Sequence, residues 1–425
     1  TGAIRQTIVG IGGNYAFDKS DTALGKYTLN NLNPRHVRVE MDLWQWEPVN
    51  DNGDPGTTNW TSFKDIGQTH VNFLQMQDFK NRGIPVVASI WDVPDWMVQN
   101  PGETIKRIIP PSMYDEAIES IAAYLLHARD QYGVTIPYVS FNEPNTGYHT
   151  LFTSPELIAF IKKAGPRFAS LGLTTKWVIG DVDGPTKTVS YVTPILQDSS
   201  IAQYLGPGVS AHSWNWDNAS DAVFSDIFSL ANQYGKQVWV EEVGLNSLGW
   251  QTAGYTSTWS YGFDLARLYY RLIRYMRASV LTYWEYGDDY PLASPTTLTP
   301  YPAFHVVKQL ADQLSPGTKI LETTSSNSKL LVIAGKNDST GNFMIQVIND
   351  SSASDTATIS GLPNANLTLQ RIRNGENGVT LGSYAPANGS LTIDLLPQSI
   401  NLLYGSASTQ TGNKIPSPPL GISIQ

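Results

Sequence analysis

The chain of 425 residues is 41% apolar and 15% charged, and its formal net charge is −9. This acidic, weakly charged composition argues against nucleic acid and anionic membranes as partners. The chain has no apolar run of about eighteen residues, which argues against a transmembrane helix. It has no cysteine, which excludes disulfide bonds and thiolate metal sites.

Short apolar runs alternate with longer helical patterns through about residue 315. Eight runs are predicted to be strands, and the first is expected to run into a glycine turn. They are residues 7–13 (TIVGIGG), 36–41 (HVRVEM), 85–91 (PVVASIW), 136–143 (IPYVSFNE), 176–182 (KWVIGDV), 208–214 (GVSAHSW), 238–244 (VWVEEVG) and 279–286 (SVLTYWEY).

Helical patterns fill most of the gaps between these strands. Residues 62–82, 112–132 and 263–277 are predicted helices, and Ser154 is a predicted N-cap with Pro155 in the first helical position. Repeated strand–helix units imply a parallel sheet, and eight of them imply a closed (β/α)8 barrel over residues 1–315. An open, doubly wound sheet is the alternative.

The pattern changes at about residue 316, where short alternating segments separated by polar turns begin. These segments predict an antiparallel β-sandwich over residues 316–406. The tail, residues 407–425, is rich in proline and is expected to be extended. Residues 1–5 are a possible extra strand of the sandwich, which the sequence leaves open.

In a (β/α)8 barrel, functional residues lie where strands end at the C-terminal face. The fourth predicted strand ends in FNEPN, residues 141–145, and the seventh ends in Glu241 and Glu242. Glycoside hydrolysis needs two carboxyl groups across one barrel mouth: one protonates the leaving oxygen, and the other attacks the anomeric carbon or activates water. A lone glutamate at a strand end is more often structural, but acids at the fourth and seventh strands together favour catalysis.

These motifs resemble the clan A glycoside hydrolases, which carry Asn-Glu at the end of strand four and Glu at the end of strand seven. Family 30 is the most similar, because RQTIVGIGGNYAF (residues 5–17) resembles its opening strand and LLPQSINLLYG (residues 395–405) resembles the end of its C-terminal sandwich. The resemblance covers nearly the whole chain. Family 39, which includes exo-β-glycosidases of the β-xylosidase type, shares the NEPN motif and stays an alternative.

The resemblance implies roles for three residues at these strand ends. Glu143 is the implied acid/base, and Asn142 is implied to hold the sugar 2-hydroxyl. Glu242 is the implied nucleophile, because it precedes an apolar residue and a glycine as the family's nucleophile does. Clan members retain configuration through a glycosyl-enzyme intermediate.

Further residues at the barrel mouth are implied to bind substrate or to support the two glutamates. Arg38 matches an arginine near the nucleophile, where a cation keeps Glu242 ionised. His212 matches the histidine of a His-x-Tyr motif whose tyrosine contacts the nucleophile; Trp214 stands at the tyrosine position, which leaves that hydrogen bond open. Trp284 matches the tryptophan beneath the sugar. Trp91 and Tyr286 are also expected to contact substrate.

Strict alternation along residues 238–244 separates the two adjacent glutamates. It predicts that Val238, Val240 and Glu242 face the barrel interior, while Trp239 and Glu241 face the helices. Glu241 is therefore predicted to support the site, paired with a cation or a hydrogen-bond donor.

Tryptophans follow many of the predicted strand ends and favour a carbohydrate cleft, since aromatic faces pack on the apolar faces of sugars. They are Trp44, Trp46, Trp91, Trp96, Trp214, Trp216, Trp250 and Trp259. The long aromatic loop over residues 245–260 suggests a wall or lid of a sugar subsite.

Other motifs are weaker. GIGGNY lacks the dinucleotide-binding spacing. NDNGDP (residues 50–55) suggests a calcium loop, but the trailing glutamate is absent and a polar turn is favoured. The six histidines are scattered, so neither a catalytic metal nor another cofactor is expected.

The sequence thus predicts a monomeric, retaining β-glycoside hydrolase that acts on oligo- or polysaccharides with two glutamates. We expect a secreted protein whose signal peptide has been removed. A catalytically silent carbohydrate-binding protein is the alternative from another functional class.

Overall fold

A computed structural model of the chain describes residues 3–16, 21–245, 252–287, 289–406 and 422–424. The larger part is a closed barrel of parallel strands, as predicted, and not an open sheet. Its strands, in barrel order, are β2 (Gly10–Tyr15), β3 (Val37–Glu40), β4 (Val86–Ile90), β5 (Tyr138–Phe141), β6 (Lys176–Val182), β7 (Leu205–His212), β8 (Gln237–Val243) and β9 (Ala278–Tyr283).

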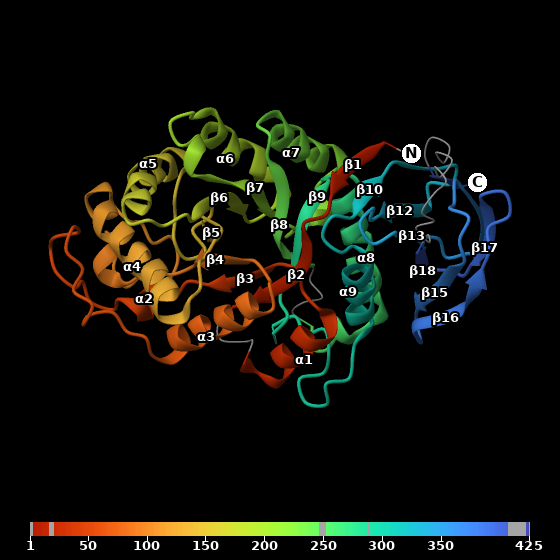
Figure 1. Ribbon diagram of the computed structural model, residues 1–425, viewed down its shortest axis with the longest axis horizontal. Coiled ribbons are helices and arrows are strands. Elements are labelled where there is room, and N and C mark those ends of the chain that lie inside the picture. The colour runs from red at the N-terminus through yellow and green to blue at the C-terminus, as the bar shows by residue number, and fades with distance from the viewer. Residues whose placement is uncertain (1–2, 17–20, 246–251, 288, 407–421, 425) are drawn as a thin grey trace.

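Helices surround this barrel (Figure 1). They are α1 (Ala23–Leu32), α2 (Leu43–Trp46), α3 (Gly67–Asn81), α4 (Tyr114–Tyr132), α5 (Ser154–Ser170), α6 (Pro185–Gln197), α7 (Asp221–Gln233), α8 (Trp259–Arg274) and α9 (Pro302–Gln313). Short 3-10 helices lie at Asp95–Met97, Pro111–Met113, Ala202–Tyr204, Trp216–Asn218 and Tyr255–Ser257. None of the helices in the described residues combines the length and apolar character that a membrane span requires.

The start of α5 differs from the prediction by one residue. Thr153, not Ser154, is the N-cap, and it forms a capping box with Glu156. Ser154 is instead the first helical residue, and its hydroxyl donates to the carbonyl of Tyr191 at 2.7 Å.

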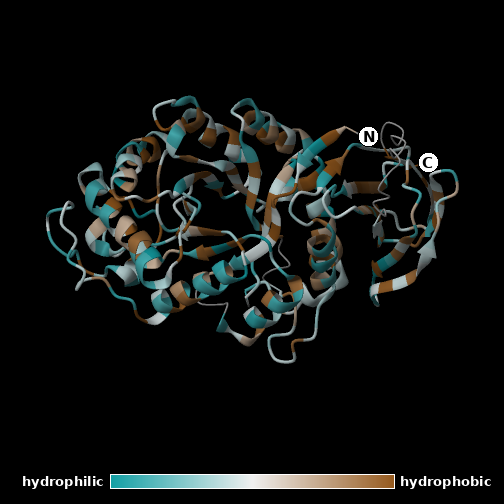
Figure 2. Ribbon diagram, in the orientation of Figure 1, coloured by the Kyte–Doolittle hydropathy of each residue, from teal (hydrophilic) through white to brown (hydrophobic). Residues whose placement is uncertain are grey.

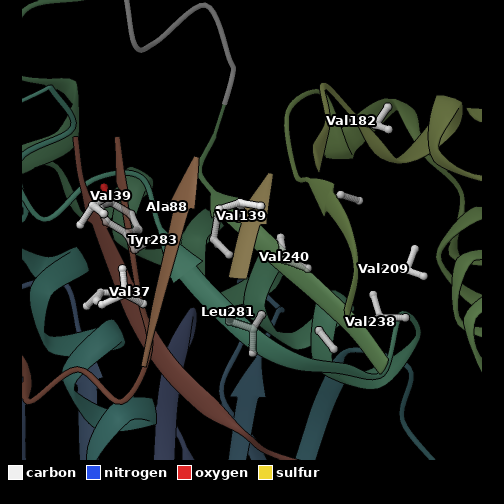
Figure 3. Packing of buried hydrophobic residues seen from close by; sticks show 14 of the residues in the cluster. Val37, Val39, Ala88, Val139, Val182, Val209, Val238, Val240, Leu281 and Tyr283 are labelled. Carbon is white, nitrogen blue, oxygen red and sulfur yellow. The ribbon is translucent and has the colours of Figure 1, made fainter. Parts of the chain in front are cut away.

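The core lies between the barrel strands and the helices. Valines and leucines on the outer side of the strands, among them Val37, Val139 and Leu281, belong to one large cluster with residues of the surrounding helices (Figure 3). Figure 2 shows hydrophobic residues concentrated on the strands and on the helix sides that face them. This layer buries most of the apolar surface that stabilises the barrel.

The predicted glycine turn at the end of the first barrel strand is wrong, because its glycines lie within β2. A Cβ on Gly12 would lie 1.7 Å from the carbonyl oxygen of His36, and one on Gly13 would lie 2.4 Å from the Tyr286 ring. The glycines therefore permit close approach of neighbouring chain segments rather than a turn.

The smaller part is a β-sandwich, and α8 and α9 lie between it and the barrel (Figure 1). One sheet has the order β1 (Ile4–Thr7), β10 (Lys319–Leu321), β12 (Leu330–Lys336), β13 (Asn342–Asn349), β18 (Ser399–Ser406), β15 (Leu367–Arg373), β16 (Glu376–Tyr384). The other has the order β11 (Thr323–Ser325), β19 (Ile422–Ile424), β14 (Asp355–Ser360), β17 (Ser390–Leu395).

Both ends of the described chain contribute to this sandwich. β1 pairs antiparallel with β10, so the possible extra strand exists, although it lies within the range 1–315 predicted for the barrel. β19, from the predicted tail, pairs with β11 and β14, while residues 407–421 of that tail lie outside the described residues. Ile333, Met344 and Leu402 of the sandwich join the barrel's main hydrophobic cluster, so the two parts share one core.

The close approach at Gly12 can be tested with Gly12→Ala. We expect it to lower stability by about 1–3 kcal/mol, since the added methyl collides with backbone that cannot move independently. Thermal melting measures the effect, and Gly53→Ala is the matched control because nothing lies within 4 Å of its Cβ position. Equal melting temperatures for the two variants would contradict the assigned packing.

Candidate active site

Arg38 of β3 lies fully buried at the centre of the barrel mouth. Its Nη1 donates to Oε1 of Glu242 at 2.7 Å and to Oδ1 of Asn14 at 3.1 Å. Its Nη2 donates to Oδ1 of Asn142 at 2.7 Å and to Oδ2 of Asp181 at 2.9 Å. Burial opposes the guanidinium charge, but Asp181 and Glu242 outweigh it and raise the pKa of Arg38. One side chain thus connects the ends of β5, β6 and β8.

His212, at the end of β7, is the second buried cation. Its Nε2 lies 3.2 Å from Oδ1 of Asp181, and its Nδ1 lies 3.0 Å from Oε1 of Glu143 and 3.2 Å from Oε2 of Glu242. Burial lowers the pKa of the imidazole, but Glu242 and the hydrogen bonds to Asp181 and Glu143 raise it to about 10. His212 is therefore an imidazolium at neutral pH and contacts three carboxyl groups.

Asp181 of β6 binds both cations, and the sequence analysis assigned it no role. Its carboxylate also accepts hydrogen bonds from the Ser140 and Ser210 hydroxyls, each at 2.7 Å. Burial would raise the pKa of Asp181, but Arg38 and His212 hold it well below its usual range. The available signal was an acid near the end of the fifth predicted strand, KWVIGDV, at the same edge as the other site residues.

Glu143 and Glu242 approach one another across this network. One carboxylate oxygen of each, together with a ring nitrogen of His212, lies within 4.8 Å of the others. The side chain of Glu143 is 13% exposed and that of Glu242 is 5% exposed. The trio has the ligand types of a metal site, and a metal ion there would have to displace the proton that the carboxyl groups favour on His212. The arrangement is better described as two carboxyl groups that share a cation.

Trp214 makes the hydrogen bond that the sequence left open. Its indole Nε1 donates to Oε2 of Glu242 at 2.9 Å, at the position where the resemblance places a tyrosine. Its ring lies so close to Gly244 that a Cβ there would be 2.5 Å away. Burial raises the pKa of Glu242, and His212 and Arg38 oppose that rise. Because indole and guanidinium groups can only donate, their hydrogen bonds favour the carboxylate form of Glu242.

The prediction from strict alternation in β8 holds for Glu242, which reaches Arg38, and is wrong for the other side chains of the strand. Val238 and Val240 face outward, in the cluster shared with the helices (Figure 3), whereas Trp239 packs inside the barrel against Val87, Val178 and Val280. The pairing of β8 with β9 shifts register between Val240 and Val243. Such a bulge inserts a residue and changes which way the following side chains point. It allows Glu242 to reach Arg38 even though Val240 points away.

Glu241 also points into the barrel, below Glu242. Its Oε2 accepts a hydrogen bond from the Thr282 hydroxyl at 3.0 Å, and its Oε1 lies 3.4 Å from Nε2 of His36. The prediction that Glu241 pairs with a cation or donor is therefore confirmed, although its direction is the reverse of the one expected.

Some aromatic residues of the barrel mouth are partly exposed, and others are buried beneath the site and pack against its residues. Trp284 is slightly exposed and packs on Trp91, with ring centroids 5.9 Å apart. Trp91 is only 1% exposed, and its ring centroid lies 4.3 Å from the Arg38 guanidinium carbon, so it supports Arg38, and its contact with substrate stays a prediction. Tyr286 is 0% exposed and packs against Tyr15, so it belongs to the support of the site, and its contact with substrate also stays a prediction.

Arg38, His212 and Asn142 are too deeply buried to offer a sugar much surface. Arg38 and His212 hold the carboxyl groups in place. The Asn142 amide contacts Arg38 and donates to the Tyr148 carbonyl at 3.3 Å, and its contact with a sugar 2-hydroxyl stays a prediction.

Tyr148 is an exposed aromatic residue that the sequence analysis missed. Its side chain is 54% exposed, and burial, with Glu143 and Glu242, raises the pKa of its hydroxyl. Of the predicted tryptophans, Trp44 is exposed and Trp46 is buried in the core against Phe73. Trp250 and the rest of 246–251 lie outside the described residues.

Comparison with known proteins gives a result at the level of structure. No protein-family model and no curated protein sequence matches the chain. A GH30 endoxylanase from Clostridium papyrosolvens C71 has a TM-score of 0.76 and 20% identity, over 96% of this chain and 98% of that chain. Xyn30A, a GH30 subfamily 8 xylanase from Clostridium acetobutylicum, has a TM-score of 0.77 and 21% identity, over 95% and 98%. The chain has the glycoside hydrolase family 30 fold.

The predicted resemblance is thus confirmed for the fold. A GH39 β-xylosidase from Caulobacter crescentus is also similar, with a TM-score of 0.62 and 12% identity over 96% of this chain and 98% of that chain. Its lower TM-score places the family 39 structure further from this chain than the two family 30 structures.

The imidazolium of His212 makes stability depend on pH. Its pKa is about 10 in the folded chain, against 6.5 for an unperturbed histidine, so the folded state holds this proton more tightly. The stability it adds is complete below about pH 6.5 and is lost as the pH rises through about 10. We expect the melting temperature to fall more steeply with pH in the wild type than in His212→Gln.

Thermal melting across this pH range measures the difference, and His70→Gln, a substitution in a side chain that is 46% exposed, is the control. Parallel curves for the wild type and His212→Gln would show that His212 is neutral in the folded protein.

Proposed function

We propose that the protein is a retaining β-glycoside hydrolase that cleaves β-linked glycans by double displacement. The observation that carries this proposal is the separation of Glu143 and Glu242, whose nearest carboxylate oxygens lie within 4.8 Å. Retaining enzymes hold their carboxyl groups about 5 Å apart, whereas inverting enzymes need about 6.5–9.5 Å to admit a water molecule. The spacing supports direct attack by one carboxylate.

The surroundings of the two groups support different roles. Glu242 accepts hydrogen bonds from Arg38 and Trp214, which stabilise its negative charge and suit a nucleophile. Glu143 receives no hydrogen bond from Arg38 or Trp214, and its side chain contacts His212 instead, so we assign it the acid/base role. Glu143 is also the more exposed of the two side chains, as proton transfer to a leaving group requires.

The reaction then follows in two displacements. In the first, Glu242 attacks the anomeric carbon while Glu143 gives its proton to the departing glycosidic oxygen, which leaves a glycosyl ester on Glu242. In the second, the ionised Glu143 removes a proton from water, and the resulting hydroxide displaces Glu242. The product keeps the β configuration, and both side chains return to their starting states.

β-Xylan is the first substrate to test, because the two family 30 structures are xylanases. Exposed aromatic surface at Tyr148 and Trp44 suits the apolar faces of sugar rings. A panel of β-xylans, β-glucans and aryl β-glycosides, with products resolved by size, separates internal cleavage from the terminal cleavage expected of a family 39-like β-xylosidase. Glycan binding without any product would instead favour a catalytically silent binding protein.

We expect Glu143→Gln and Glu242→Gln each to lower kcat at least about 10²–10⁴-fold on β-glycans, since each removes a group required for bond cleavage. Glu376→Gln, in the surface hairpin of the sandwich, is the matched control. Release of reducing sugar measures turnover.

Rescue by azide separates the two roles. With an activated aryl glycoside, azide replaces the missing nucleophile in Glu242→Gly and yields the α-glycosyl azide. In Glu143→Gly it attacks the glycosyl ester and yields the β-glycosyl azide. Exchanged anomers would reverse the assignment, and near-normal turnover in either Gln variant would refute it.

The Trp214 hydrogen bond predicts a shift in pH dependence. Trp214→Phe removes a donor from the Glu242 carboxylate, so the pKa of Glu242 should rise and kcat/KM should fall about tenfold or more. The acid limb of the kcat/KM profile should then move to higher pH. Trp214→Tyr, which keeps a donor, should retain part of the activity; an acid limb that stays in place in Trp214→Phe would show that the ring only packs.

A further inference from the structure

A second group of carboxylates lies outside the barrel mouth, where the loop after α2 meets the start of α4. It contains Asp51 of that loop with Glu116 and Glu119 of α4. One carboxylate oxygen of each lies within 4.8 Å of the other two. Because Glu116 and Glu119 are three residues apart on a helix, both face the loop from the same side. We name this group the loop–α4 acidic site.

Glu119 is the observation that distinguishes this group from an ordinary acidic surface. The residue is only 3% exposed, and its Oε1 is buried and accepts no hydrogen bond. Oδ1 of Asp51 is buried and without a partner in the same way. Buried carboxylate oxygens without donors are costly, so such oxygens normally have a partner.

Basic side chains do not supply that partner. In the part of the chain that the structure describes, no lysine, arginine or histidine forms an ion pair with Asp51, Glu116 or Glu119. Arg167 lies near Glu119 but forms no ion pair with it, so within the described residues the three carboxyl groups have no direct cationic partner.

The hydrogen bonds within the loop leave one carboxylate oxygen of Asp51 free to bind a ligand. The polar turn favoured from NDNGDP is present, because Asp54 accepts hydrogen bonds from the Gly56 amide and the Thr57 hydroxyl. Asp51 is held differently: its amide donates to Oε1 of Glu47 at 3.0 Å, and its Oδ2 accepts from the Asn59 amide. Oδ1 of Asp51 is left without a hydrogen-bond partner. The glutamates that the loop motif lacks are supplied by the helix.

We propose that Asp51, Glu116 and Glu119 bind a hard divalent cation, Ca²⁺, at the loop–α4 acidic site. Ca²⁺ is coordinated by oxygen atoms at about 2.3–2.6 Å, so two oxygens on one ion lie no more than about 5 Å apart, and the observed limit meets this condition. A site built from carboxylates without histidine or cysteine excludes the softer metals. Mg²⁺ fits less well, because it usually keeps several waters and demands stricter geometry.

The bound cation would fasten the loop to the barrel wall. The loop also accepts a hydrogen bond from Trp96 at the Glu47 carbonyl, at 2.8 Å, and Trp46 just before it donates to the Ser120 carbonyl at 3.2 Å. A cation bound to Asp51 would therefore hold the loop between α2 and α3 against the start of α4.

Calorimetric titration of the chelator-treated full chain with CaCl2 at neutral pH tests the proposal. We expect one equivalent to bind with a Kd on the order of 10⁻³ M or tighter, and the melting temperature to rise with Ca²⁺. Glu116→Gln and Glu119→Gln should each weaken binding about tenfold or more, since ligand charge sets the affinity of Ca²⁺ sites.

Two controls locate the ion. Asp115→Asn removes an exposed neighbour that pairs with Lys163, and Glu143→Gln removes a carboxyl group of the barrel mouth; both should keep the wild-type affinity. Glu116 is partly exposed, so Glu116→Gln gives an answer if Glu119→Gln fails to fold. No heat and no melting shift up to about 10⁻² M Ca²⁺, or unchanged binding in Glu116→Gln, would overturn the proposal.

Discussion

The buried Arg38 guanidinium is the constraint on which the barrel mouth depends. A cation without access to water must have its charge and hydrogen bonds satisfied by protein groups, or it destabilises the fold. Arg38 finds these groups in Asn14, Asn142, Asp181 and Glu242, which come from four other strands or strand ends. Its position therefore fixes theirs. Together with His212, the second cation, Arg38 balances the negative charges of Asp181 and Glu242.

The sequence predicted the positions of the two central glutamates well. Parallel strands bring all their C-terminal ends to one face of the barrel, so residues at strand ends converge however far apart they are in the chain. Motif resemblance then selected Glu143 and Glu242, and the structure brings these two together. The position of Asp181 near a strand end also fits this rule, but the sequence did not predict its role. An acid within a strand does not indicate which cations it will pair with in the folded protein.

The predicted directions and roles of other side chains were less accurate, and one cause is a local irregularity in the backbone. The prediction from alternation failed for most of β8 because the residue types of VWVEEVG do not reveal a register shift. The valines and glutamates of this run fit the strand plausibly with or without the bulge. Aromatic residues were ambiguous for another reason: Trp91 and Tyr286 are suited equally to a core and to a sugar surface, and burial alone separates them. The role of Trp214 depended on where one ring nitrogen points, which residue type does not reveal.

The pairing of β1 with β10 makes the barrel an insertion within the sandwich. The chain enters the sandwich sheet at β1, leaves it to form the whole barrel, and returns to the same sheet at β10. The two segments that flank the barrel are therefore joined by backbone hydrogen bonds as well as by the chain between them. A fragment cut at residue 315 would carry β1 as an orphaned strand with unpaired peptide groups, prone to association with other chains. Such a cut would also expose the apolar surface that the barrel buries against Ile333, Met344 and Leu402 of the sandwich.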